Sequence, residues 1–138
     1  MPFAVEFFVA LDDEVASEMG PQYRSHGLPA FMCVGIYPDD VMGDWEVLLV
    51  GGAATSPRVV VAMANDGLEV LELPERLGSA LTQASREQLV ETARAWVGLE
   101  TMKDEGISVK EAVEILCEVA GLARTAATLR QPLYCWAI

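Results

Sequence analysis

The chain has 138 residues, of which 52% are apolar, so it can build one domain around its own core. Its 21 acidic residues outnumber the 9 basic ones and give a net charge of −12. That charge repels phosphate groups, which argues against a nucleic-acid-binding protein and against attachment to an anionic membrane. It favours a basic protein partner, although acidity also serves simply to keep an apolar-rich chain in solution.

The cysteines and the first residues indicate a cytoplasmic protein. Cys33, Cys117 and Cys135 are odd in number, far apart and set among apolar residues, which is typical of reduced core thiols. Residues 1–14 carry acids and show neither the basic n-region nor the cleavage site of a secretion signal. The longest stretch without an acid, Lys or Arg is 25–38, which is too short to span a bilayer.

The chain opens with a predicted strand over residues 3–10. Alternation puts Phe7 and Leu11 on one face and Phe8 on the other. Asp12 has the side chain and the position to cap a short helix over residues 13–19, which Gly20-Pro21 ends.

The middle of the chain predicts four more strands, three of them in a meander. One strand is expected over residues 30–37, and the meander over 45–50, 58–64 and 68–73. Asn65-Asp66-Gly67 is typical of a hairpin turn, because Asn and Gly tolerate the positive φ that such turns need.

After the meander, the spacing of apolar residues changes from two to 3.6 and predicts helices. We expect helices over residues 75–82 and 85–102, and a long one between Ser108 and the stop signal at Gln131-Pro132. Ser85 to Gln88 and Ser108 to Glu111 both have the spacing of a capping box.

The last helix and residues 133–138 organise the predicted fold. Apolar side chains cover most of the helix circumference, so we expect this helix to be covered on two sides. The final six residues are apolar on both faces, which predicts an inner strand, placed beside the first strand. The sequence therefore predicts a single α+β domain, residues 1–138. It would consist of a mostly antiparallel sheet (N-terminal strand, central meander and C-terminal strand) packed against two long helices.

Two regions resemble a family of small acidic actinobacterial proteins. The first is Val5 to Glu14, a short aromatic strand followed by acids. The second covers Ala93 to Trp96 with Glu100, Leu122 to Arg124, and the ending Leu133-Tyr134-Cys135-Trp136. Members of that family carry no assigned activity, so the resemblance implies a shared fold and supplies no catalytic residues.

Two groups of acids are candidates for a partner-binding surface. If they lie together in the fold, they form a negative patch able to steer a basic protein. The candidates are Asp12, Asp13, Glu14, Glu18, Asp39, Asp40, Asp44 and Glu46.

Aromatic residues suggest a second possibility, a ligand pocket between the sheet and the helices. Its candidate lining is Trp45, Trp96, Glu100, Tyr134 and Trp136, although aromatics at these spacings are more often core.

Other chemistry has little support in the sequence. A nucleophilic pair of Cys33 with His26, the sole histidine, competes with the simpler reading of Cys33 as an inert core thiol. No cysteine spacing fits a zinc site, and the glycines at 51–52 are followed by no lysine that would make a phosphate loop. We expect no catalytic residues, no metal and no cofactor.

These observations predict a non-catalytic acidic interaction module, such as an immunity-type or inhibitory partner of a basic protein. The alternative is a small-molecule-binding protein or small enzyme with a pocket between sheet and helices. A homodimer would also account for the high apolar content.

Overall fold

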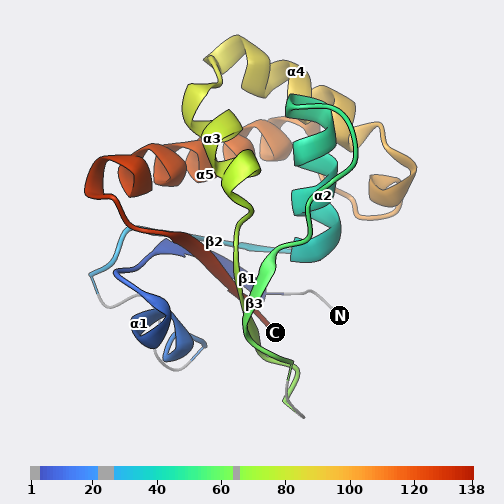
Figure 1. The fold of residues 1–138 in the computed structure, drawn as a ribbon. Helices are drawn as coiled ribbons and strands as arrows, with labels where there is room; N and C mark the ends of the chain where they lie inside the picture. The colour runs from blue at the N-terminus through green and yellow to red at the C-terminus, as the bar shows by residue number, and fades with distance from the viewer. Residues whose placement is uncertain (1–3, 22–26, 64–65) are drawn as a thin grey trace.

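A computed structural model describes residues 4–21, 27–63 and 66–138 and contains one five-stranded antiparallel sheet (Figure 1). The strand order is β2-β1-β5-β4-β3. The strands are β1 (Ala4–Val9), β2 (Ala30–Val34), β3 (Arg58–Val61), β4 (Glu69–Glu72) and β5 (Leu133–Ala137). The helices are α1 (Asp13–Ser17), α2 (Pro38–Leu49), α3 (Glu75–Gln83), α4 (Arg86–Val97), the short 3₁₀ helix η1 (Glu100–Met102) and α5 (Val109–Leu129). The predicted α+β class is confirmed.

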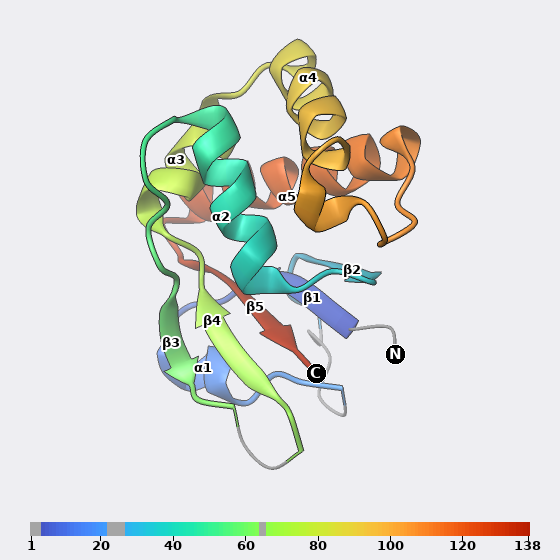
Figure 2. The same ribbon diagram turned by 90° about the vertical axis from the view of Figure 1, so that its right-hand side faces the viewer.

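The sheet separates two hydrophobic clusters. Helices α2 to α5 lie over one face, and α1 lies against the other (Figures 1 and 2). Strand β5 shows the division, because Cys135 packs into the helix-covered core while Tyr134 and Trp136 pack on the α1 side. Residues of α1 and residues of α2 are therefore held on opposite faces of the sheet.

The predicted central place of the last strand is confirmed. Strand β5 pairs with β1 on one side, in the register Phe7↔Cys135, and with β4 on the other. All five of its residues are buried. Ala4 and Ile138 exchange both backbone hydrogen bonds, so the two ends of the sheet's central pair are tied together.

Helix α5 is covered on two sides, as predicted. Helices α3 and α4 pack along it from above, and β1, β2 and β5 pack beneath it (Figure 1). Eight of its side chains are buried: Ala112, Ile115, Leu116, Val119, Ala120, Leu122, Ala123 and Ala126. Among the residues that the structure describes, no helix combines the length and the apolar character needed to cross a membrane.

The predicted strand over residues 45–50 is wrong, since this segment is the second half of helix α2. Pro38 begins the helix, and Val41, Trp45 and Leu48 then follow the helical spacing. This spacing is not visible when residues 45–50 are considered alone. The central meander is consequently reduced to the antiparallel β3–β4 hairpin. The hairpin turn predicted at Asn65-Asp66-Gly67 falls partly outside the described residues.

Smaller differences concern the ends of elements. Leu11, predicted to share a face with Phe7, lies beyond the strand, which stops at Val9, and this residue is 65% exposed. Strand β2 stops at Val34, and the helix predicted to reach Met102 ends at Val97, followed by η1. The capping box at Ser85 is fully formed, whereas at Ser108 the hydroxyl accepts from the Glu111 backbone N–H and donates to the Glu111 carboxylate.

Candidate functional site

The first half of α2 carries a group of carboxylates on its outer side. Pro38 occupies the first helical turn, where its missing N–H costs nothing, and Asp39 and Asp40 follow at the positive end of the helix dipole. Both side chains are exposed, and Asp44 is half-buried one turn later. The local sequence thus explains both why the helix begins here and why its first turns are acidic.

Two acids from other elements join this group. Glu69 of β4 lines a hollow of about 320 Å³ together with Asp39. Glu105, in the loop after η1, lines a small cleft with Asp40 and Asp44. Thr101 lies in the same cleft, and its hydroxyl donates to Asp44 Oδ2 at 3.0 Å. We call this set, Asp39, Asp40, Asp44, Glu69 and Glu105, the α2 acidic surface.

Three carboxylates of the α2 acidic surface, Asp39, Asp44 and Glu69, have raised pKa values, and burial is the largest cause in each. Burial, followed by the charge of Asp40, raises the pKa of Asp39. Burial is also the largest cause for Asp44, where the Asp40 charge adds to it and the bond from Thr101 opposes it. The pKa of Glu69 is raised by burial and then by the charge of Asp39. None of the ion pairs formed between described residues includes a member of this surface.

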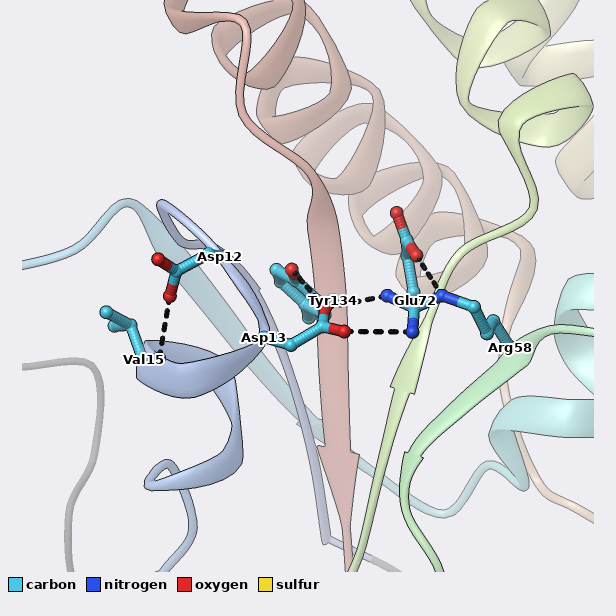
Figure 3. Close-up of polar contacts among 6 residues, drawn as sticks. All are labelled: Asp12, Asp13, Val15, Arg58, Glu72 and Tyr134. Carbon is cyan, nitrogen blue, oxygen red and sulfur yellow. Dashed lines mark hydrogen bonds and ion pairs between the residues drawn. The ribbon is translucent and has the colours of Figure 1, made fainter.

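The other predicted acids lie on the far side of the sheet. Asp12, Asp13, Glu14 and Glu18 belong to α1 and its two caps, whereas α2 packs against the opposite face. The structure does not bring the two groups together. The α1 acids are also partly engaged, since Asp12 Oδ1 caps the helix by accepting from the Val15 N–H at 3.0 Å (Figure 3).

Asp13 belongs to a network that fastens α1 to the sheet. Arg58 of β3 donates to both Asp13 oxygens, at 2.6 and 2.9 Å, and its Nε donates to Glu72 of β4 at 2.7 Å (Figure 3). The Tyr134 hydroxyl of β5 donates to Asp13 Oδ1 at 2.8 Å. The bonds from Arg58 and then from Tyr134 lower the pKa of Asp13. Burial, and next the bond to Asp13, raises the pKa of Tyr134. The network therefore has a structural role.

Glu46 is removed from the surface altogether. Its side chain is fully buried, and Oε2 accepts from the Thr55 backbone N–H at 2.8 Å and the Thr55 hydroxyl at 3.0 Å. Arg76 Nη1 lies 3.5 Å from the same oxygen and also donates to Ala53 O, and Nη2 donates to Gly51 O. Glu46 thus holds the loop between α2 and β3 against α3.

The predicted aromatic pocket is divided between two layers. Trp45 and Trp96 pack edge to face, with ring centroids 5.3 Å apart, inside the helix-covered core. Tyr134 and Trp136 lie in the other cluster, where Trp136 Nε1 donates to Glu6 Oε1 at 3.0 Å. Glu100 is exposed in η1. These residues do not share one cavity.

A groove that the sequence did not suggest lies elsewhere. It has a volume of about 420 Å³ and runs between α3, the end of α5 and the adjoining ends of β4 and β5. Small side chains such as Gly78, Ala123 and Ala127 leave this space, and Arg130 and Gln131 line it at the end of α5. Its shape depends on how two helices pack, so no local pattern could reveal it.

Cys33 does not have the properties of a nucleophile. Burial raises the pKa of its thiol to about 12, which keeps it protonated at neutral pH, and its proposed partner His26 lies outside the described residues. Cys33, Cys117 and Cys135 are free thiols, as expected. Within the described part of the chain, no group of three or more His, Cys, Asp or Glu side chains is arranged to hold a metal ion.

Sequence reasoning found three members of the α2 acidic surface and missed Glu69 and Glu105. Glu69 comes from a strand more than twenty residues further along, and Glu105 from a loop near the start of α5. Only the packing of α2 between these elements places them beside Asp39 and Asp40, so their position carries no local signal.

A comparison with protein-family models, curated proteins and solved structures finds no match for this chain.

Proposed function

We propose that this protein is a non-catalytic interaction module that binds a basic protein through the α2 acidic surface. The observation that supports this proposal is that five carboxylates from α2, β4 and the loop after η1 lie close together. Among the described residues, none of the five is paired with a basic side chain. An immunity-type or inhibitory role is the form of this proposal that best suits a small acidic domain. The free thiols suit a cytoplasmic location.

The raised pKa values explain why a basic partner would be favoured. Asp39, Asp44 and Glu69 are partly desolvated and lie close to other negative charges, so their ionised forms are less stable than in water. A lysine or arginine placed between them would relieve that repulsion. The negative potential of these carboxylates would also accelerate the encounter with a basic protein, and salt would weaken this acceleration.

The contacts of the basic residues also support a basic partner, because several of these residues already bind acidic or carbonyl groups of this chain. Arg58 is bound to Asp13 and Glu72, and Arg76 to Glu46. Arg124 donates to the backbone carbonyls of Thr82 and Ala84. The positive charges that remain free to oppose the acidic surface are therefore fewer than the composition alone indicates.

The test is a binding measurement with paired charge variants. Proteins captured from lysate at low salt would be purified, and their dissociation constants measured for the wild type and for Asp40→Asn/Asp44→Asn. The matched control is Glu87→Gln/Glu91→Gln, which removes two exposed acids from α4. We expect basic partners, binding that weakens at high salt, and a loss of affinity confined to the α2 variant. Equal affinity for both variants, or indifference to salt, would refute the proposal.

A small-molecule-binding role is the second candidate, and the groove beside Arg130 is the observation that favours it. Its volume of about 420 Å³ lies within the range of ligand sites. A thermal-shift screen would detect a ligand, because binding to the folded state raises the melting temperature. Substituting a bulky residue for a wall residue, as in Ala127→Phe, should abolish any such shift.

A further inference from the structure

Strand β2 lies at one edge of the sheet and pairs only with β1. No other described segment is hydrogen-bonded to its outer side. The outer edge of a strand presents a row of unpaired N–H and C=O groups, which is a template for another strand.

The hydrogen-bond pattern identifies which groups face outward. Ala4 exchanges both bonds with Ile138 of the β5 side, so β1 residues with even numbers turn toward β5. Because pairs alternate along an antiparallel ladder, the odd-numbered residues of β1 turn toward β2, as the bond from Val9 N to Pro29 O confirms. Their partners Phe31 and Cys33 are thus engaged. Ala30, Met32 and Val34 direct their backbone groups away from the sheet.

The two edges of the sheet differ in how they are protected. Strand β3 begins with Arg58, which is held in the ion-pair network, and its pairing with β4 is interrupted by a bulge between Val59 and Val61. Charges and bulges are the usual means of blocking edge-to-edge pairing. Strand β2 reads Ala-Phe-Met-Cys-Val and has neither a charge nor a proline inside it.

Helix α5, which packs on β2, carries exposed negative charge. It packs over β1 and β2, while α3 and α4 cover its other flanks. Its exposed side includes Glu111, Glu114 and Glu118, spaced three and four residues apart along one stripe. These carboxylates appear in none of the ion pairs among described residues. A basic strand added at β2 would therefore lie against a sheet edge whose covering helix is acidic on its exposed side.

We propose that the β2 edge accepts an extended basic segment of the partner as a sixth strand. Backbone bonds to Ala30, Met32 and Val34 would hold the segment, and its lysine or arginine side chains on the helix side would face the α5 glutamates. A second copy of this chain fits less well, because a two-fold axis at β2 would bring two such stripes together between molecules of charge −12. This inference rests on the proposed function and adds to the α2 acidic surface a second point of contact with the same partner.

The first experiment uses hydrogen exchange on the full chain. The probe is a synthetic peptide of alternating lysine and valine, and the control peptide has the same charge but proline in place of the valines. We expect the lysine–valine peptide to slow exchange of the Ala30, Met32 and Val34 amides, while the Phe31 and Cys33 amides are protected already. Unchanged exchange at the three outward amides would overturn the proposal.

The second experiment removes one outward donor. Met32→Pro deletes an N–H that β1 does not use, and proline is tolerated at such positions of edge strands. The control, Met32→Ala, removes the same side chain and keeps the N–H. We expect Met32→Pro to lose at least tenfold in affinity for the lysine–valine peptide and Met32→Ala to lose much less. Urea unfolding would confirm that both variants are folded.

The outcomes separate this inference from the proposed function. If a basic partner binds the wild type and Met32→Pro equally, strand addition is wrong and the acidic interaction module stands. If no basic protein or peptide binds at all, both fail. Light scattering that shows a dimer in wild type and a monomer in Met32→Pro would assign the edge to a second copy and overturn the proposal.

Discussion

Replacing Arg76 by methionine would leave the buried Glu46 carboxylate without its cation. The closest atoms of the pair are 3.5 Å apart, the Glu46 side chain is fully buried, and Arg76 is 44% exposed. Two unit charges at that distance attract by about 5 kcal/mol at an effective dielectric constant of about 20. Solvent around the exposed guanidinium reduces this, so we expect a loss of about 2 kcal/mol in the free energy of unfolding.

The assay is urea unfolding followed by tryptophan fluorescence, to which Trp45, the neighbour of Glu46, contributes. With a denaturant slope of about 1.5–2 kcal/mol/M for a chain of this size, Arg76→Met should lower the midpoint by about 1 M. Arg124→Met is the matched control, because Arg124 also donates to two backbone carbonyls but has no carboxylate partner among the described residues. That variant should lose no more than about 1 kcal/mol.

A double-mutant cycle completes the test. If the cost of Arg76→Met comes from the uncompensated charge, then Glu46→Gln in the same chain should restore about half of the lost stability or more. Equal losses for Arg76→Met and Arg124→Met, together with no recovery in the double variant, would refute the assignment. Glu46 would then be held by Thr55 alone.

Three further predictions concern single residues. Arg130 ends α5 with φ 55°, a left-handed conformation that glycine adopts without strain, so Arg130→Gly should raise the free energy of unfolding by about 0.5–1 kcal/mol in urea titrations. The pKa of Asp13 is lowered from 3.8 in the folded protein. The Asp13 carboxylate therefore contributes fully to the free energy of unfolding above pH 3.8, and this contribution is lost as the pH falls through the pKa of the folded state. Melting temperatures of wild type and Asp13→Asn should therefore differ at neutral pH and converge in acid. The pKa of Asp39 is raised from 3.8, so its ionised form opposes folding. Asp39→Asn should be slightly more stable than wild type at neutral pH in urea titrations, and the two should be equally stable well below pH 3.8; a less stable variant at neutral pH would contradict this reasoning.

The sequence by itself determined the elements that carry strong local signals. Helix α4 follows from its capping box, and α5 from an apolar arc wide enough to need cover on two sides. The last strand is apolar on both faces, so both faces need cover, which is typical of an inner strand. These features depend on residues near one another in the chain, so the local sequence is enough to predict them.

Tertiary structure decided where the charges meet. The strand order and the packing of helices on the two faces separate the α1 acids from those of α2, bury Glu46 against Arg76, and bring Glu69 and Glu105 to Asp39 and Asp40. The segment 45–50 illustrates the same limit, because six apolar-rich residues suit a strand or a buried helix equally well. The rest of α2 and its contact with Trp96 select the helix. Charges and short apolar runs acquire their roles from neighbours that are distant in the chain, and only the fold supplies those neighbours.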